Sequence, residues 1–186
     1  NGPFVDLRLD ALSTGETARL ALGHPLLVTT TDGAVDVTVT VSSPRWAQFD
    51  TIVLYLNSVP EPYDHDGNPE TRERYRVNPG SVLVAGTDFT LNEAPAVPGV
   101  PGSEHWTASA TLELLSLTTD TWILAVVRGT PGVSRPLFPI VPGLDAAQNP
   151  TFEDLIDGNL GEGGDLALAF TNPLFVDADG DGQWTP

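Results

Sequence analysis

The arrangement of apolar and polar positions along the chain indicates β-strands. From Val35 to Ser42, valine occupies every odd position and a polar residue every even position. Successive side chains of a strand point to opposite faces, so this period of two places four valines on one face of a sheet. Residues Thr107 to Leu114 alternate in a similar way. Both segments predict strands with one face in the core and the other in water.

Two further segments, Ile52 to Leu56 and Trp122 to Val127, are apolar at nearly every position. Continuous apolar runs of this length are typical of central strands that are covered on both faces, or of twisted strands in the middle of a sandwich. Weaker strand signals occur at 4–9, 25–30, 166–170 and 175–176. Residues 71–77 alternate mostly between charged side chains, which indicates an exposed edge strand or hairpin.

Glycine (18 residues) and proline (17 residues) separate these short segments, as is typical of all-β domains. Two stretches rich in both, 92–104 and 129–143, are predicted to be loops. Helix signals occur only at 151–157, where acidic residues open a short segment that ends at a glycine. We therefore predict a single domain, residues 1–186, with an all-β, immunoglobulin-like antiparallel β-sandwich of seven to nine strands and one short helix.

Composition excludes several classes of function. The chain has no cysteine, which rules out disulfides, Cys-based zinc sites and thiol catalysis. Its formal net charge is −17, from 25 acidic and eight basic residues, so we expect no nucleic-acid partner. No apolar run reaches about 18 residues, so we expect no membrane insertion. The acidity is compatible with salt adaptation, with solubility of an extracellular module or with binding of divalent cations.

The strongest chemical signal is the acidic loop at 177–183. Asp177, Asp179 and Asp181 follow a spacing of two residues, and Gly182 comes directly after them. This pattern matches the first half of a D-x-D-x-D-G calcium loop, in which short carboxylates converge on one cation and glycine permits a sharp turn. The backbone carbonyl of Gln183 is placed to add a ligand. We predict that Asp177, Asp179, Asp181 and Gln183 bind Ca²⁺; the alternative is a solvated turn rich in aspartate.

A second acidic segment offers weaker evidence for a metal site. Asp64, Asp66 and Asn68 have the same spacing, but Pro69 occupies the position of the loop glycine. The tip of a hairpin is the favoured interpretation, and a second calcium site at these three residues is the alternative.

Other candidate binding residues are scattered. Arg72, Arg74 and Arg76 share one face of the strand expected at 71–77, where pairing with nearby carboxylates is favoured over anion binding. Of the four tryptophans, Trp46 and Trp122 are expected in core or loop-filling positions. Trp106 and Trp184 are the two candidates for exposed positions that stack on a sugar. The sequence contains no recognisable catalytic motif, and its three histidines are far apart, at 24, 65 and 105.

Several segments together carry a resemblance to a known family. They are NGPFV at 1–5, VLYLN at 53–57, DTWILAVVRG at 120–129 and AFTNPLFVDADGDG at 169–182. In this order they resemble the β-sandwich region that follows the catalytic domain in bacterial CehA/McbA-type metallohydrolases of the PHP superfamily. The ending T-N-P-x-x-V-D-x-D-G-D-G is the most specific element.

The resemblance implies a parent protein that is a metal-dependent hydrolase with its catalytic ligands upstream of Asn1. We expect the chain to be a non-catalytic, calcium-stabilised accessory module of a secreted, periplasmic or cell-surface hydrolase, with that upstream domain as its partner. The alternative is a free-standing module that binds carbohydrate or protein. An enzymatic role would require residues that are dispersed along the sequence.

Overall fold

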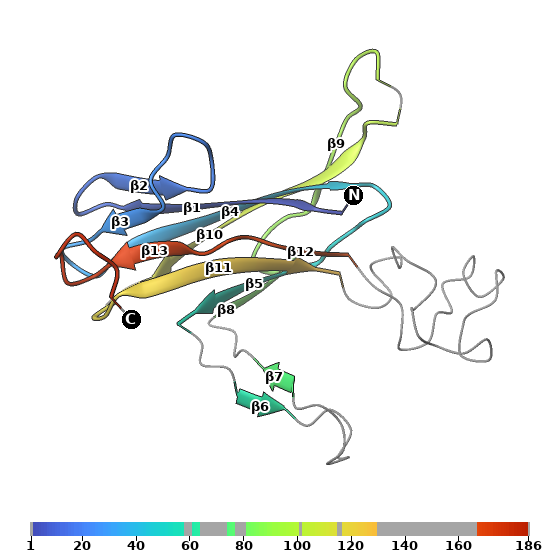
Figure 1. The fold of residues 1–186 in the computed structure, drawn as a ribbon. Coiled ribbons are helices and arrows are strands. Elements are labelled where there is room, and N and C mark those ends of the chain that lie inside the picture. The colour runs from blue at the N-terminus through green and yellow to red at the C-terminus, as the bar shows by residue number, and fades with distance from the viewer. Residues whose placement is uncertain are drawn as a thin grey trace.

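The computed structural model describes residues 2–57, 81–100, 102–114, 117–129 and 167–185, together with the backbone of 61–63 and 74–76. Every regular element in these segments is a strand. Two open sheets pack face to face as a sandwich, and a separate two-stranded hairpin lies beside them (Figure 1). The predicted all-β sandwich is therefore confirmed.

The first sheet contains five strands in the order β2-β1-β4-β10-β9, and all of its pairs are antiparallel. Their bounds are β2 (Glu16–Arg19), β1 (Phe4–Ala11), β4 (Val35–Pro44), β10 (His105–Leu114) and β9 (Asn92–Ala94). The alternating valines of β4 are all buried, as their period of two predicts. In the pairing register, Val39 lies opposite Leu7 on one side and Ala110 on the other.

The second sheet contains six strands and supplies the elements around the candidate site. Its order is β3-β13-β11-β5-β8, and β12 also pairs with β11. Their bounds are β3 (Leu27–Thr29), β13 (Leu174–Asp177), β11 (Thr121–Arg128), β5 (Thr51–Leu56), β8 (Ser81–Val84) and β12 (Leu168–Phe170). Strand β3 runs parallel to β13, so this sheet is mixed and not purely antiparallel.

The core lies between the two sheets. Side chains with essentially no exposed surface come from both of them, including Leu7, Leu9, Val37 and Val39 from the first sheet and Ile52, Leu54, Ile123 and Leu174 from the second. Phe49 stacks on Phe89 with 6.2 Å between ring centroids. The runs at 52–56 and 122–127 form the two central strands of the second sheet, β5 and β11, as predicted. Strand β11 is not covered on both faces, because Trp122, Leu124 and Val126 are only half-buried.

Strands β12 and β13 both pair with β11, and Thr171 connects them. Its backbone N–H donates to the carbonyl of Ala125 at 2.9 Å, and its hydroxyl accepts the Ala125 N–H at 3.0 Å. The buried hydroxyl thus supplies the acceptor that a strand carbonyl would otherwise provide. The hydrogen-bond ladder of β11 continues across the interruption between the two short strands.

Some strand predictions were wrong in number and place. Within the described residues, the sandwich has eleven strands and not seven to nine. Edge strands of three or four residues, such as β2 and β9, have too few positions to show a period in the sequence. Strand β9 lies inside the predicted loop 92–104. The hairpin expected near 71–77 is present as β6 (Glu61–Tyr63) paired with β7 (Arg74–Arg76).

The tryptophan predictions also need correction. Trp46, expected in a core or loop-filling position, is 50% exposed. Trp106 and Trp184, the two candidates for exposed positions, are half-buried. The indole N–H of Trp106 donates to the carbonyl of Arg45 at 3.1 Å, and Trp184 packs on Phe175 with 5.2 Å between ring centroids.

Several predicted features lie outside the described residues. These are the helix at 151–157, the second metal site at Asp64, Asp66 and Asn68, and the side chains of Arg72, Arg74 and Arg76. Within the described segments, no helix is long and apolar enough to cross a membrane.

The turn between β3 and β4 has a strict steric requirement. Gly33 has φ +72°, and its carbonyl accepts the N–H of Leu117 at 2.9 Å. A Cβ at residue 33 would overlap the Leu117 carbonyl oxygen. Gly23 has a similar φ of +84°, but a Cβ there would meet nothing within 4 Å.

We therefore expect Gly33→Ala to destabilise the fold more than Gly23→Ala. Strain at positive φ costs both variants about 1 kcal/mol, and the contact with Leu117 adds at least about 1 kcal/mol in the first. Urea denaturation followed by circular dichroism measures the difference. Equal losses in the two variants would contradict this role of Gly33.

Candidate metal centre

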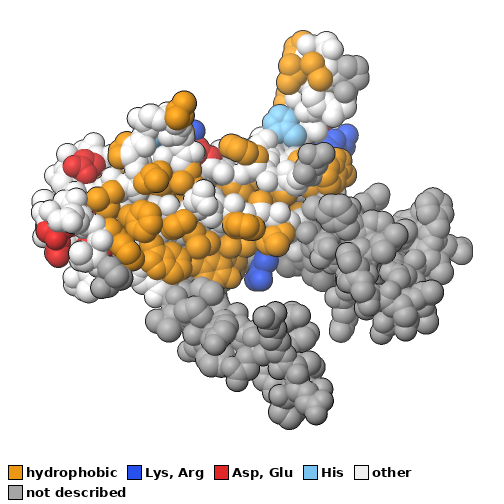
Figure 2. Space-filling view, in the orientation of Figure 1, with side chains coloured by type: hydrophobic (Ala, Val, Ile, Leu, Met, Phe, Trp, Pro, Cys, Tyr) orange, Lys and Arg blue, Asp and Glu red, His pale blue; other side chains and the backbone are white. Residues whose placement is uncertain are grey.

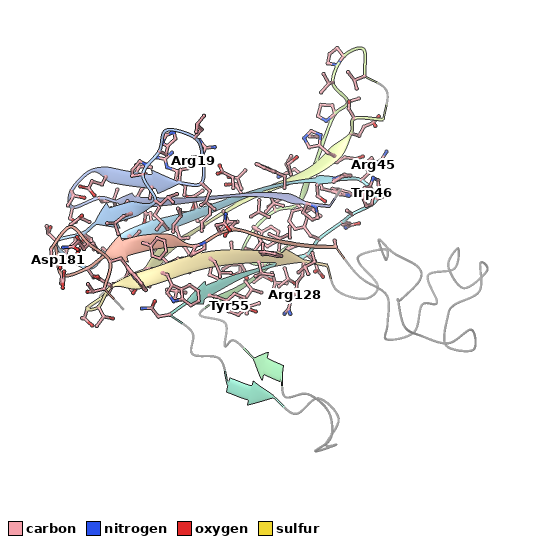
Figure 3. All side chains as sticks on the ribbon, viewed as in Figure 1. Arg19, Arg45, Trp46, Tyr55, Arg128 and Asp181 are labelled. Carbon is pink, nitrogen blue, oxygen red and sulfur yellow. The ribbon has the colours of Figure 1, made fainter. Side chains whose placement is uncertain are left out.

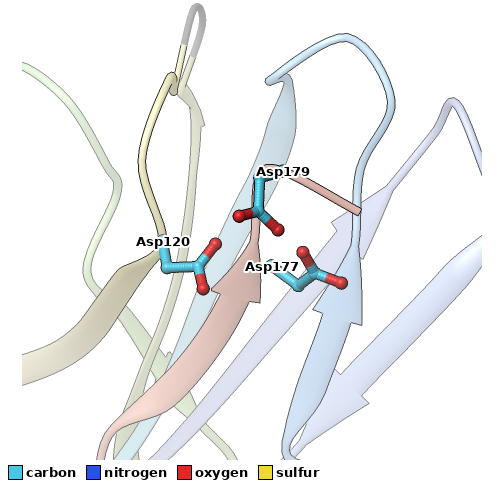
Figure 4. A group of neighbouring side chains, drawn as sticks. All are labelled: Asp120, Asp177 and Asp179. Carbon is cyan, nitrogen blue, oxygen red and sulfur yellow. The ribbon is translucent and has the colours of Figure 1, made fainter. Parts of the chain in front are cut away.

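Three aspartates meet at one end of the second sheet. Asp177 is the last residue of β13, Asp179 lies in the turn that follows, and Asp120 comes directly before β11. Each offers a carboxylate oxygen, and these oxygens all lie within 4.8 Å of one another (Figure 4). Such a group can hold a metal ion.

The pairing of β13 with β11 explains why distant residues meet here. The two strands are antiparallel, and Thr121 lies opposite Val176. The residue before Thr121 and the residue after Val176 are therefore neighbours, which places Asp120 beside Asp177. The carboxylate of Asp177 is buried at this junction and accepts a 3.2 Å hydrogen bond from the hydroxyl of Thr29 on β3.

Hydrogen bonds to Asp177 shape the turn that carries Asp179. The N–H groups of Gly180 and Gly182 donate to its two carboxylate oxygens at 2.6 and 2.8 Å. Both glycines have positive φ, +78° and +81°, which non-glycine residues rarely adopt. The sequence prediction of a sharp turn at Gly182 is confirmed, and Gly180 adds a second one.

The carboxylate of Asp120 accepts hydrogen bonds from residues in and after the turn. One of its oxygens accepts the N–H of Ala178 at 2.9 Å. The other accepts the N–H of Thr185 at 2.7 Å and the Thr185 hydroxyl at 3.3 Å. The acidic loop therefore folds back onto the body of the protein.

The carboxylates keep some capacity for a cation. An ionised carboxylate has about four lone-pair sites. Asp177 and Asp120 each accept three hydrogen bonds, which leaves each about one site for a metal. Asp179 accepts one, from the N–H of Asp181 at 3.1 Å. The cluster thus combines oriented carboxylates with free oxygen lone pairs, as a hard cation requires.

The electrostatic environment differs between the two loop aspartates. Burial acts to raise the pKa of Asp177, but hydrogen bonds from Gly182, Gly180 and Thr29 outweigh it and lower the pKa below its ordinary value. For Asp179, the hydrogen bond from Asp181 N–H acts to lower the pKa. Desolvation and repulsion from Asp181, Asp120 and Asp177 together exceed that effect, so the pKa of Asp179 is raised. Negative charge is therefore crowded around Asp179.

Asn57 holds the segment that carries Asp120. Its side-chain NH₂ donates to the Asp120 carbonyl at 2.7 Å, and its side-chain oxygen accepts the Trp122 N–H at 2.9 Å. Asn57 has φ +35°, in the left-handed region that asparagine tolerates better than most residues. This clamp from the end of β5 fixes the backbone on both sides of Thr121.

The structure assembles part of the predicted ligand set. Asp177 and Asp179 belong to the cluster, but Asp181 does not; its exposed carboxylate accepts the N–H of Gln183 at 2.8 Å. Gln183 is exposed, and its predicted role as a carbonyl ligand stays a prediction. Sequence reasoning missed Asp120. Its position directly before an apolar strand was visible, but the pairing of that strand with 174–177 was not.

No protein-family model matches this chain, and a search of curated proteins finds no significant match.

The hydrogen bonds of Asp177 lead to a prediction for metal-free protein. Asp177→Asn keeps the shape but places an NH₂ group against one of the two glycine N–H donors. Leaving a buried donor without an acceptor costs about 1–3 kcal/mol. We expect this loss of unfolding free energy in EDTA, measured by urea denaturation. Asp181→Asn is the matched control, because Asp181 is exposed, and an equal loss there would refute the assignment.

Proposed function

We propose that this chain is a non-catalytic β-sandwich module stabilised by calcium bound at Asp120, Asp177 and Asp179. The observation that carries the proposal is the meeting of three carboxylates, from two segments far apart in sequence, within 4.8 Å. Like charges this close repel one another, as the raised pKa of Asp179 indicates. A divalent cation between them would remove that repulsion.

Calcium suits this donor set better than the common alternatives. Hard oxygen ligands favour calcium or magnesium over zinc and copper, which prefer nitrogen or sulfur. Magnesium requires a near-ideal octahedron, whereas calcium accepts six to eight oxygens in varied geometry. Hydrogen bonds fix two of the carboxylates in place, which favours the ion with the looser requirement. Water or backbone carbonyls would complete the coordination.

The bound ion would have a structural role. Asp120 already contacts both Ala178 and Thr185, so a cation on the cluster would join β11, β13 and the last described residues. The sandwich has no disulfide to serve this purpose, since the chain lacks cysteine. Calcium would therefore act as the cross-link at this end of the sandwich.

We also propose that the connectivity is immunoglobulin-like. In this assignment, β1, β4, β10 and β9 correspond to strands A, B, E and D of one sheet. Strands β13, β11, β5 and β8 correspond to G, F, C and C′ of the other. The observed order of neighbours in each sheet supports the assignment.

The biological setting that we propose is an accessory role in a secreted or cell-surface metal-dependent hydrolase. The resemblance of the ending T-N-P-x-x-V-D-x-D-G-D-G to the sandwich region of CehA/McbA-type proteins supports it. The carbohydrate-binding alternative has less support, because Trp106 belongs to the first sheet and Trp184 packs on Phe175 of the second. These two tryptophans form no common platform.

Calcium should raise the melting temperature, and EDTA should reverse the effect. Sites of this extracellular type have dissociation constants on the order of 10⁻⁴ to 10⁻³ M. Calcium at about 100 times the dissociation constant stabilises a protein by about 2.7 kcal/mol. For a domain of this size, that corresponds to an increase of roughly 5–10 °C, measured by differential scanning calorimetry.

Single-residue variants distinguish the proposed ligands from the ligand set predicted from sequence alone. Asp120→Ala and Asp179→Ala should both abolish the stabilisation by calcium. Asp181→Ala should retain most of it, because that carboxylate is outside the cluster. A full response to calcium in Asp120→Ala would disprove the proposed centre. Loss of the response only in Asp181→Ala would instead support the ligand set predicted from sequence, which includes Asp181 and not Asp120.

The proposed setting has a separate test in the coding sequence upstream of Asn1. We expect an H-x-H motif and further histidines of the metal-ligand type in the same reading frame. A signal peptide that ends at Asn1 would refute the accessory role and leave the calcium site unaffected.

A further inference from the structure

A cleft of about 380 Å³ opens on the outer face of the first sheet, at the end where β1 begins. Phe4 pairs with Ser42 across β1 and β4, and His105 pairs with Pro44 across β10 and β4. All four residues line the cleft. Ser42 and Pro44 alternate along β4 with core residues such as Val41, so they and their partners point outward. Clefts of this volume commonly hold small ligands.

Residues 102–104, which directly precede β10, also line this cleft. The described part of the connection between β9 and β10 projects from the sandwich here, and Figure 2 shows apolar side chains on the projection. Within it, the hydroxyl of Ser103 accepts the Val97 N–H at 2.7 Å and donates to the Val100 carbonyl at 2.7 Å. These hydrogen bonds give this side of the cleft a defined shape.

Three polar side chains of the cleft keep free hydrogen-bonding capacity. Within the described residues, the carboxylate of Glu104 and the hydroxyl of Ser42 have no hydrogen-bond or ion-pair partner. Nδ1 of His105 lies 3.0 Å from the carbonyl oxygen of Ser103. Because a carbonyl only accepts, Nδ1 carries the proton, and the neutral ring presents Nε2 as an acceptor. The cleft thus offers a carboxylate, an imidazole nitrogen and a hydroxyl, all of which can accept hydrogen bonds.

The charge around the cleft is negative. None of the described residues that line it is lysine or arginine. Arg45 lies at this end of the sandwich (Figure 3), but its guanidinium pairs with Glu93 at 2.8 Å. Arg19, which reaches the outer face of the same sheet, pairs with Asp6. The unpaired Glu104 therefore sets the charge of the cleft, in a protein of net charge −17, and such a cleft attracts cations and repels anions.

Phe4 supplies an aromatic surface beside these acceptors. It is 70% exposed, so packing in the core does not account for it. Residues that pair directly across antiparallel strands have Cβ atoms about 4.5–5.5 Å apart, which places Phe4 beside Ser42. The face of an aromatic ring carries partial negative charge and attracts a cation within about 6 Å of its centroid. The ring and the carboxylate of Glu104 thus favour the same kind of ligand.

We propose that this cleft binds a primary ammonium group on a short apolar chain, as in a lysine side chain or a small alkylamine. An ammonium group has three N–H donors and no acceptor, which matches the acceptors of Glu104, His105 and Ser42. The apolar chain then lies on Phe4 and Pro44. Figure 3 shows Arg45 and Asp181 at opposite ends of the sandwich, so this site is separate from the metal centre and does not depend on it.

Titration of the full chain with n-butylammonium chloride, followed by NMR of the backbone amides, tests the proposal. Amides at 42–44 and 103–107 should shift, with a dissociation constant on the order of 1 mM. Glu104→Gln should weaken binding about tenfold or more, because it removes the charge and keeps the shape. Glu113→Gln is the matched control: Glu113 is exposed on β10 outside the cleft, so the same change of charge should leave binding intact.

Further probes distinguish the sources of the ammonium group and the outcomes that contradict the site. Tighter binding of Nα-acetyl-lysine methylamide identifies a lysine of a protein partner, whereas tighter binding of 1,5-diaminopentane identifies a free amine. Equal binding of n-butylammonium by Glu104→Gln and the unchanged chain would overturn the assignment. Shifts with methyl β-D-glucopyranoside but not with n-butylammonium would also overturn it and indicate a neutral sugar. EDTA should leave binding unchanged, so failure here is distinct from failure of the metal centre.

Discussion

The antiparallel pairing of β11 with β13 is the constraint on which the candidate site depends. It joins residues 121–123 to residues 174–176, more than fifty positions apart. Because Thr121 lies opposite Val176, Asp120 and Asp177 must be neighbours. A shift of the register by one residue would exchange the two faces of β13 and separate these carboxylates. The geometry of the acidic centre is thus a consequence of how two apolar strands pack.

The same junction shows how a protein tolerates crowded negative charge. Asp177 is buried, yet backbone N–H groups and a threonine hydroxyl occupy most of its lone pairs. Asp120 is stabilised in a similar way by Ala178 and Thr185. Asp179 has fewer donors, and its pKa is raised. Hydrogen bonding therefore stabilises two of the three charges, and the third is where an added cation would have the largest effect.

The sequence predicted features that depend on short stretches of chain. The alternation at 35–42 and 107–114 identified β4 and β10, the apolar runs identified β5 and β11, and the spacing of aspartate and glycine identified the turn at Gly182. Short edge strands were not predictable, since β9 has only three residues. Asp120 was also beyond reach, because its role depends on long-range pairing. Asp181, which the motif includes, is not part of the cluster, and its carboxylate accepts the backbone N–H of Gln183.

Thr171 has a consequence for how the fold opens. Its side chain and backbone both bond to Ala125, so β12 and β13 are held by β11 on either side of a fixed point. Fraying that starts at the acidic turn would therefore break the pairs of β13 with both β11 and β3 before it reached Thr171, while β12 stayed paired. Sub-global opening of this kind follows boundaries between cooperative segments. Strands β3 and β13 would then exchange their amide protons together, and a cation at the acidic cluster would slow that exchange.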